Sequence, residues 1–182
     1  ITTMLMSVVL FDYGRSNDRL AVSGAAQELA LAIREAQTYG INVREAAVWS
    51  YQFSKGYGIY VNPSADGGNY YIFADKISSE NQIYDAGLGC GNLETECVQR
   101  LSLRNGVTIT AIGSNNPCPA GINATSLNIY FKRPNPDALM HFVNNDRTAA
   151  CASQNYGVIT LTSPKGVTKN VIIQGTGQVY VQ

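Results

Sequence analysis

The chain has 182 residues and a formal net charge of zero at pH 7, and only 14% of its residues are charged, against about 25% in an average globular protein. This length suffices for one domain with a sizeable core. A neutral chain has no general attraction to nucleic acid or acidic lipid, so the composition favours neither as a partner.

The chain opens with ITTMLMSVVLF, residues 1–11, which contain no charged side chain. As a helix this stretch would be apolar on all sides, which is typical of a helix in lipid or at the centre of an assembly. It is about half as long as the roughly 20 residues that cross a bilayer, and no basic region or cleavage site marks a signal peptide. We interpret residues 1–14 as part of a truncated apolar helix, with a buried first strand as the alternative.

Residues 15–40 have the pattern of an amphipathic helix. Asn17 or Asp18 could cap its start, and Gly40 suits a left-handed residue just after its end. Apolar side chains recur at steps of three and four, so they would share one face that packs on a sheet. These positions are Val22, Ala26, Leu29, Ile33 and Ala36.

From residue 41 onward, short runs with strand-like composition are separated by turn signals. RNG (104–106) and GTG (175–177) resemble hairpin turns. The predicted fold class is therefore α+β, with an N-terminal helix over 1–40 packed on an antiparallel β-rich head over 41–182. The predicted strands are residues 43–49, 57–61, 70–74, 97–103, 106–112, 126–132, 156–162, 167–173 and 177–182.

Four cysteines form an even set without a C-x-x-C pair. A zinc site would need closer ligand spacing and more histidine than the single His141. We therefore predict two disulfides, Cys90–Cys97 across the loop CGNLETEC and Cys118–Cys151 across a longer connection. Disulfides imply an oxidising compartment. Other pairings and free buried thiols are the alternatives.

The stretch ADKISSENQIYD (74–85) is a candidate calcium site. Asp75, Glu80 and Asp85 would supply carboxylate oxygens, the ligands that Ca²⁺ prefers. The stretch lacks the regular alternation and the glycine of an EF-hand loop, so a solvated loop without metal is the alternative.

The sequence predicts no catalytic residue and no cofactor site, and we do not expect an enzyme. A Ser-His-Asp or Cys-His arrangement would need His141 as its base, but this residue lies in the apolar run DALMHFV and suits a structural role. The glycines of GLGCGN (87–92) do not have the spacing of a nucleotide-binding loop.

The apolar opening followed by NDRLAVSGAAQELALAIREAQTYGINV resembles the N-terminal half of type IV pilin-like proteins, in particular the GspH/FimT-type pilins and pseudopilins. The resemblance continues through GYGIYV, YYIFAD, LRNGVTI and LNIYFKRPNP. It ends with YGVITLTSPKGVTKNVIIQGTGQVYV and so covers nearly the whole chain. It implies the type IV pilin-like fold, in which a long N-terminal α-helix packs on an antiparallel β-rich head.

The resemblance also implies a structural subunit of an extracellular filament, either a type IV pilus-like filament or a type II secretion pseudopilus. Such a subunit is inserted in the bacterial inner membrane and then polymerises, with copies of itself or with other pilins, through its apolar helix. The family's cleavage glycine and the glutamate that follows it have no counterpart here, so the chain is expected to begin partway into this helix. The residues expected in the filament core are Ile1, Met4, Leu5, Val8, Val9, Leu10 and Phe11.

The alternative function is a minor pilin whose β head binds a surface, a secreted substrate or DNA. Some FimT-type pilins capture DNA through arginines near the C-terminus, but this tail has no basic residue after Lys169. Lys165 and Lys169 alone form a weak electrostatic footprint, so no nucleic-acid partner is expected. NAT at Asn123 matches a glycosylation sequon. The sequence leaves open whether the subunit is major or minor.

Overall fold

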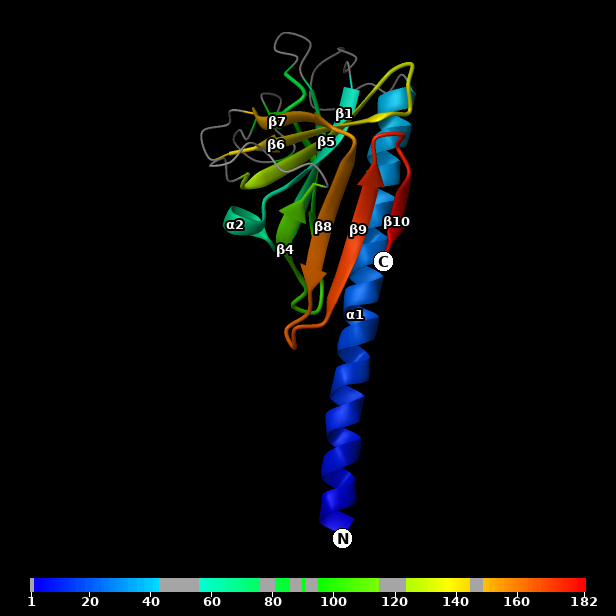
Figure 1. Cartoon of the computed structure of the whole chain (residues 1–182), viewed down its shortest axis with the longest axis vertical. Coiled ribbons are helices and arrows are strands. Elements are labelled where there is room, and N and C mark those ends of the chain that lie inside the picture. The colour runs from blue at the N-terminus through cyan, green and yellow to red at the C-terminus, as the bar shows by residue number, and fades with distance from the viewer. Residues whose placement is uncertain are drawn as a thin grey trace.

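A computed structural model describes residues 2–42, 56–75, 81–85, 90, 95–114, 124–144 and 149–182; within these ranges, the side chains of residues 2–15, 149, 150, 152 and 153 are not described. The chain begins with one long helix, α1 (Thr2–Ile41), whose C-terminal half packs on a β-rich head (Figure 1). The fold is therefore α+β, with an N-terminal helix on an antiparallel head, as the sequence predicts.

The head contains two antiparallel sheets and a short helix, α2 (Pro63–Asp66), between β1 and β2. The six-stranded sheet has the order β3 (Cys97–Ser102), β2 (Asn69–Ala74), β1 (Gly56–Val61), β5 (Ser126–Lys132), β6 (Ala138–Val143) and β7 (Ala149–Gln154). The four-stranded sheet has the order β10 (Val179–Val181), β9 (Thr168–Gln174), β8 (Tyr156–Thr162) and β4 (Thr108–Gly113).

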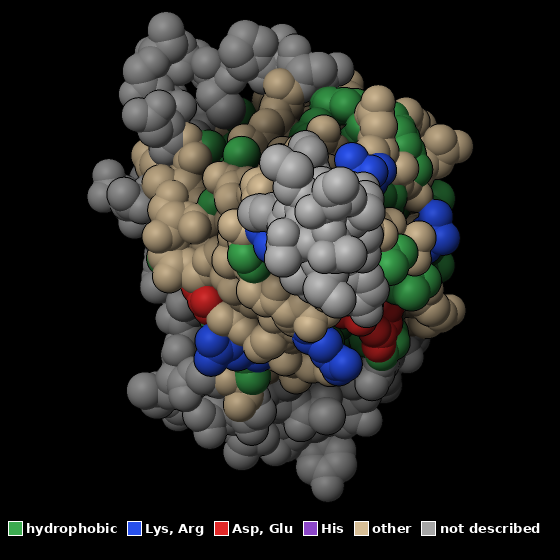
Figure 2. All heavy atoms as spheres, turned by 90° about the horizontal axis from the view of Figure 1, so that it is seen from below, with side chains coloured by type: hydrophobic (Ala, Val, Ile, Leu, Met, Phe, Trp, Pro, Cys, Tyr) green, Lys and Arg blue, Asp and Glu red, His purple; other side chains and the backbone are tan. Residues whose placement is uncertain are grey.

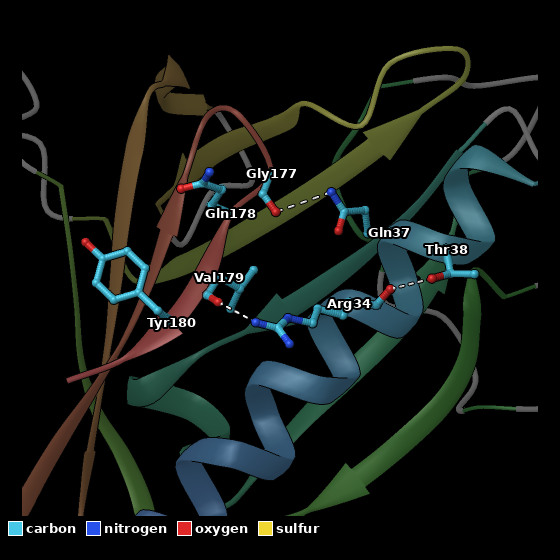
Figure 3. Close-up of a pocket in the computed structure, with 7 residues that line it drawn as sticks. All are labelled: Arg34, Gln37, Thr38, Gly177, Gln178, Val179 and Tyr180. Atoms are coloured by element: carbon cyan, nitrogen blue, oxygen red, sulfur yellow. Dashed lines mark hydrogen bonds between the residues drawn. The ribbon is translucent and has the colours of Figure 1, made fainter.

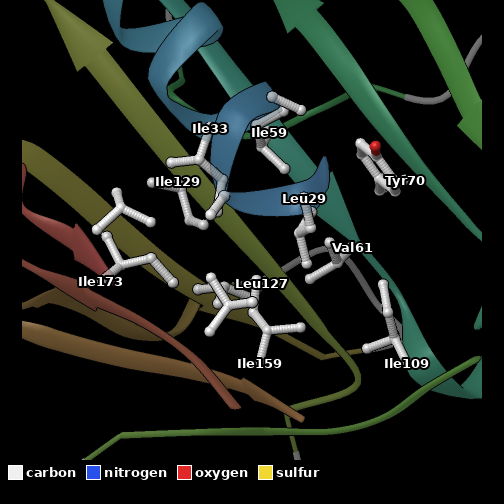
Figure 4. Packing of buried hydrophobic residues seen from close by; sticks show 14 of the residues in the cluster. Leu29, Ile33, Ile59, Val61, Tyr70, Ile109, Leu127, Ile129, Ile159 and Ile173 are labelled. Atoms are coloured by element: carbon white, nitrogen blue, oxygen red, sulfur yellow. The ribbon is translucent and has the colours of Figure 1, made fainter. Parts of the chain in front are cut away.

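The main core lies where α1 meets the inner faces of both sheets (Figure 4). Burial alternates along β8, because successive side chains of a strand point to opposite faces. Leu29 and Ile33 of α1 pack in one cluster with Ile129 of β5, and also with Ile159 of β8 and Ile173 of β9. The five positions predicted for the apolar face of the helix, Val22, Ala26, Leu29, Ile33 and Ala36, are each 0% exposed.

A second, aromatic cluster lies on the other face of the six-stranded sheet. Phe73 of β2 and Tyr130 of β5 stack with ring centroids 6.4 Å apart, and Tyr84 lies 5.7 Å from Phe73. Tyr60 and Tyr71 extend the array at centroid distances of 4.9 and 5.7 Å from Tyr84. The head therefore buries apolar surface on both faces of this sheet.

Two strands in the C-terminal half were not predicted. β6 is buried at five of its six positions, so it lacks the apolar-polar alternation that identifies a half-exposed strand. β7 has the sequence AACASQ, which is poor in β-branched and aromatic residues. The strand predicted over 43–49 lies outside the described residues.

The two predicted hairpin turns had different outcomes. GTG lies in the turn between β9 and β10, which pair antiparallel, and Gly177 has a φ of 82°. RNG also forms a turn, with φ values of 56° at Asn105 and 70° at Gly106, but the hairpin prediction is wrong. The turn leads from β3 of the larger sheet to β4 of the smaller one, where β4 pairs with β8. Local turn chemistry reverses the chain but does not choose the partner strand.

The predicted boundaries inside α1 were also wrong. The helix is continuous from Thr2, so neither Asn17 nor Asp18 caps its start. Gly40 lies inside the helix, and a Cβ atom there would come within 2.5 Å of the Phe131 carbonyl oxygen. Glycine at this position therefore allows α1 to approach β5 closely and does not terminate the helix.

Candidate functional site: the projecting helix and its attachment

The most prominent feature of the molecule is the N-terminal half of α1, which projects far beyond the head (Figure 1). At 1.5 Å per residue, a helix of 40 residues is about 60 Å long. Among the side chains that the structure describes, those of α1 are buried from Val22 onward, and the N-terminal part of the helix extends beyond the head. One half of the helix is thus part of the core of the head, and the backbone of the other half extends away from it.

Asp18 anchors α1 to the head close to the point where the helix leaves it. One Asp18 carboxylate oxygen accepts hydrogen bonds from Ser163 Oγ at 3.0 Å and from the Lys165 backbone N–H at 3.1 Å. Lys165 Nζ also lies 4.0 Å from the other oxygen. The residue predicted as a helix cap instead fixes α1 to the turn between β8 and β9.

Replacing Asp18 by alanine is expected to lower the free energy of unfolding by about 1–3 kcal/mol, because the buried Ser163 hydroxyl and the Lys165 amide lose a charged acceptor. Lys165→Met is the matched control, since it removes the exposed ion pair but keeps both hydrogen bonds; such pairs contribute about 0–1 kcal/mol. Urea unfolding measures the stability, and exchange of the Lys165 amide hydrogen should accelerate only in the Asp18 variant. Equal losses in the two variants would refute this assignment.

A second attachment joins α1 to the turn between β9 and β10, to the start of β10 and to the segment before β6 (Figure 3). Arg34 Nη2 donates to the Val179 carbonyl at 2.8 Å, and Gln37 Nε2 donates to the Pro136 carbonyl at 2.8 Å and to the Gly177 carbonyl at 3.3 Å. An open pocket on the surface lies around these contacts, and in it the Tyr180 ring points away from α1. The residues that line it are Arg34, Gln37, Thr38, Gly177, Gln178, Val179 and Tyr180. Polar contacts therefore fix α1 at both ends of its buried stripe, the core-facing positions from Val22 to Ala36.

The face of α1 opposite the core carries two exposed leucines. Leu20 is 71% exposed and Leu31 is 62% exposed. Glu28, Arg34 and Glu35 are exposed on the same part of the helix. These apolar and charged side chains form an exposed stripe on the face of α1 opposite the core.

The residues predicted for a filament core fall in the projecting segment. The backbone of α1 is helical from Thr2 through Phe11, while Ile1 and the side chains of Met4, Leu5, Val8, Val9, Leu10 and Phe11 lie outside the described parts. In the residues that the structure describes, no helix is long and apolar enough to cross a membrane.

The predicted cysteine pairs are partly within the described residues. Cys90 and Cys97 form a disulfide with their Cα atoms 4.6 Å apart, which is the pair preferred from the sequence. Cys151 is also disulfide-bonded, and its predicted partner, Cys118, lies outside the described residues. The sequon residue Asn123 is likewise outside them.

Two of the calcium candidates, Asp75 and Asp85, are in contact with or part of a short segment, residues 81–85, whose Tyr84 belongs to the aromatic cluster. Asp75 is buried and accepts a hydrogen bond from the Gln82 backbone N–H at 2.9 Å. Asp85 accepts from Asn81 Nδ2 at 3.2 Å, and Glu80 is outside the described residues. In the part of the chain that is described, no three His, Cys, Asp or Glu side chains are grouped to hold a metal ion.

Side-chain acceptors hold this segment in place. Asn128 of β5 accepts from the Tyr84 backbone N–H at 2.9 Å, and Glu96 accepts from the Asp85 backbone N–H at 2.7 Å. Since Asp75 accepts from Gln82, buried side chains bind three backbone N–H groups of this segment, those of Gln82, Tyr84 and Asp85. Backbone groups buried away from water need such partners, so we interpret these polar residues as structural.

His141 belongs to the same set of contacts. Its Nε2 atom lies 2.9 Å from Gln82 Oε1, and its side chain is 7% exposed. Burial lowers the pKa of His141 below the usual 6.5. A neutral, buried histidine in contact with an amide suits the structural role that the sequence predicts.

Because the pKa of His141 is lower in the folded state, protonation favours unfolding, and stability decreases as the pH falls below the pKa of the unfolded chain. We expect the stability advantage of the wild type over His141→Gln to shrink between about pH 7.5 and about pH 5.5. Urea unfolding of both proteins at the two pH values measures this change. A pH-independent difference would contradict the burial of a neutral imidazole.

In the view along α1 from its N-terminal end, the Lys and Arg side chains of the described residues do not form a continuous patch (Figure 2). Lys and Arg side chains are spread over this end of the head, with Asp and Glu side chains between them. Lys165 is paired with Asp18.

Asp18, Arg34 and Gln37 were not identified as attachment residues from the sequence. Their partners are 145, 145 and 99 or more positions away along the chain, and no local pattern encodes contacts over such separations. Comparisons of the chain with models of protein families, with curated proteins and with solved structures found no match.

Proposed function

We propose that this protein is a structural subunit of an extracellular filament, of the type IV pilus or type II secretion pseudopilus kind, that polymerises through α1. The observation that supports the proposal best is the division of α1 into a half packed in the head and a half that projects from it. The apolar, uncharged sequence of residues 1–11 needs a partner that excludes water.

In this proposal the projecting segments of neighbouring copies, or of other pilins, pack together along the filament axis. Before assembly the same segment lies in the bacterial inner membrane. Lipid tails are as apolar as leucine, so the exchange of lipid for protein gains little from hydrophobic transfer, and close packing must stabilise the bundle. Leu20 and Leu31 would extend this packing along the exposed face of α1.

The two attachments of α1 would matter for such a filament. The hydrogen bonds of Asp18 near one end, and of Arg34 and Gln37 near the other, fix the helix to the head in one orientation. A fixed orientation lets identical contacts repeat from subunit to subunit, which a helical assembly requires. The proposed role is therefore structural and not catalytic.

The test is removal of residues 1–11 from the gene in the cell that makes the protein. We expect extracellular filaments to disappear from negative-stain images, while the protein still accumulates with a protease-resistant head. A full-length protein with Leu31→Ala serves as a milder change on the same helix. Filaments of normal abundance without residues 1–11 would rule out assembly through this segment.

The second candidate function is a binding module, a minor pilin whose head contacts a surface or a secreted substrate. An open pocket on the head, formed around Asp137, Asn155 and Gln174, favours this alternative. Full binding by a protein that lacks residues 1–11 would support it.

A further inference from the structure

A pocket of about 570 Å³ opens on the head beside the attachment of Gln37, whose acceptors Pro136 and Gly177 are the chain neighbours of the lining residues Asp137 and Thr176. Three chain segments meet there: the start of β6, the bend between β7 and β8, and the turn between β9 and β10. The residues that line it are Asp137, Asn155, Tyr156, Gln174, Gly175 and Thr176.

Backbone hydrogen bonds join these three segments. The Ala138 N–H donates to the Gly175 carbonyl at 2.9 Å, and the Gly175 N–H donates to the Asn155 carbonyl at 2.8 Å. A Cβ atom on Gly175 would lie 3.2 Å from Asn155 Cα, so glycine permits this close contact. The pocket is therefore preformed, which reduces the entropy that a ligand must overcome on binding.

The polar side chains of the pocket are available to form hydrogen bonds with a ligand. In the described residues, the side chains of Asp137, Gln174 and Thr176 form no hydrogen bond or ion pair, and neither does the Tyr156 hydroxyl. Asp137, Asn155 and Thr176 are exposed, and Tyr156 and Gln174 are partly buried. The pocket thus presents a carboxylate, two amides, two hydroxyls and one aromatic ring to solvent.

This set of groups restricts the class of ligand. None of the lining residues is cationic, so an anion would meet the charge of Asp137 without compensation. One carboxylate is too few for a calcium site, which takes six to eight oxygen ligands. The only large apolar group among the lining side chains is the Tyr156 ring, which is too small to hold a lipid chain.

We propose that this pocket binds a neutral sugar. Sugar hydroxyls donate and accept hydrogen bonds, as do the amides of Asn155 and Gln174, and the Asp137 carboxylate accepts from two hydroxyls at once. The C–H face of a pyranose ring packs on the ring of Tyr156. The site lies on the head and is independent of whether the chain forms filaments.

The test is ligand-observed NMR and calorimetry on the full chain, kept in a detergent without a sugar head group. The probes are glucose, galactose, N-acetylglucosamine and their β-linked disaccharides, with glucuronate and Ca²⁺ as competitors of other chemistry. We expect at least one neutral sugar to bind with a Kd of roughly millimolar. Asp137→Ala should weaken it about tenfold or more, because hydrogen bonds to a charged acceptor are the stronger ones.

The turn between β9 and β10 offers a matched pair of variants. Gln174 lines this pocket, whereas Gln178 lines the pocket beside Arg34 on the other side of the turn. Gln174→Ala should weaken sugar binding several-fold, and Gln178→Ala should leave it unchanged, with circular dichroism confirming that all variants are folded. The proposal is wrong if no neutral sugar binds, if glucuronate or Ca²⁺ binds in preference, or if the Asp137 and Gln174 variants bind like the wild type.

Discussion

Replacing Val8 by aspartate is expected to abolish filament formation while the head remains folded. Val8 lies in the projecting part of α1, 14 positions before the first residue of the buried stripe at Val22. In the proposed assembly it would pack among apolar helices, where a charged side chain costs about 2.5–3.5 kcal/mol at the centre of a membrane-like environment. Every subunit of the filament would incur this cost, so even one substitution should prevent polymerisation.

Ser64→Asp is the matched control, because it adds the same charge at an exposed position of α2. A carboxylate in the first turn of a helix is tolerated or slightly stabilising. Negative-stain images of cells that produce each variant should show filaments only for Ser64→Asp, and urea unfolding should show heads of similar stability. Normal filaments with Val8→Asp would place the projecting segment outside the subunit contacts.

Replacing Leu29 by alanine is expected to destabilise the head by about 2–5 kcal/mol. Leu29 is fully buried where α1 meets both sheets, and it packs in one cluster with Val61, Leu127 and Ile159 (Figure 4). Alanine preserves the helix propensity, so the loss would report the missing core contacts and not a weakened helix. Urea or thermal unfolding of the variant measures it.

Leu31→Ala separates packing in the head from packing between subunits. Leu31 is two positions away on the same helix but is 62% exposed, so its replacement should change the free energy of unfolding by about 0.5 kcal/mol or less. The same variant should reduce filament length or abundance if the exposed stripe contributes to assembly. Equal destabilisation by the two substitutions would contradict the orientation of α1 on the sheets.

Features with a local periodic signal could be predicted from the sequence. The buried stripe of α1 follows from the spacing of Val22, Leu29 and Ile33, and β8 follows from the alternation in YGVITLT. The preferred Cys90–Cys97 pair follows from its short separation. In each case the residues that determine the feature are neighbours along the chain.

Features that depend on distant partners could not be predicted. The RNG turn has the chemistry of a hairpin, but β4 pairs with β8, more than 40 residues later. Glycine is common just after a helix end, but at position 40 it is needed because a Cβ atom would collide with the Phe131 carbonyl. Asp18 has the chemistry of a helix cap, but it binds Ser163. The residue type shows which contacts a side chain can form, and the fold determines which partner it contacts.

The same distinction applies to the candidate sites. Calcium binding was inferred from carboxylates that are close in sequence, yet Asp75 accepts a hydrogen bond from the backbone of Gln82 and Asp85 accepts one from Asn81. The pocket around Asp137 was not inferred, because its residues come from three segments that only the tertiary structure brings together.

The most direct test of the central proposal is a helical reconstruction of filaments that contain this protein. We predict that residues 2–15 of neighbouring subunits pack against one another along the filament axis, with the β heads on the outside and α1 attached to each head through Asp18, Arg34 and Gln37. Filaments whose axis is lined by the heads, or an absence of this chain from the filaments of the cell that makes it, would contradict the proposal.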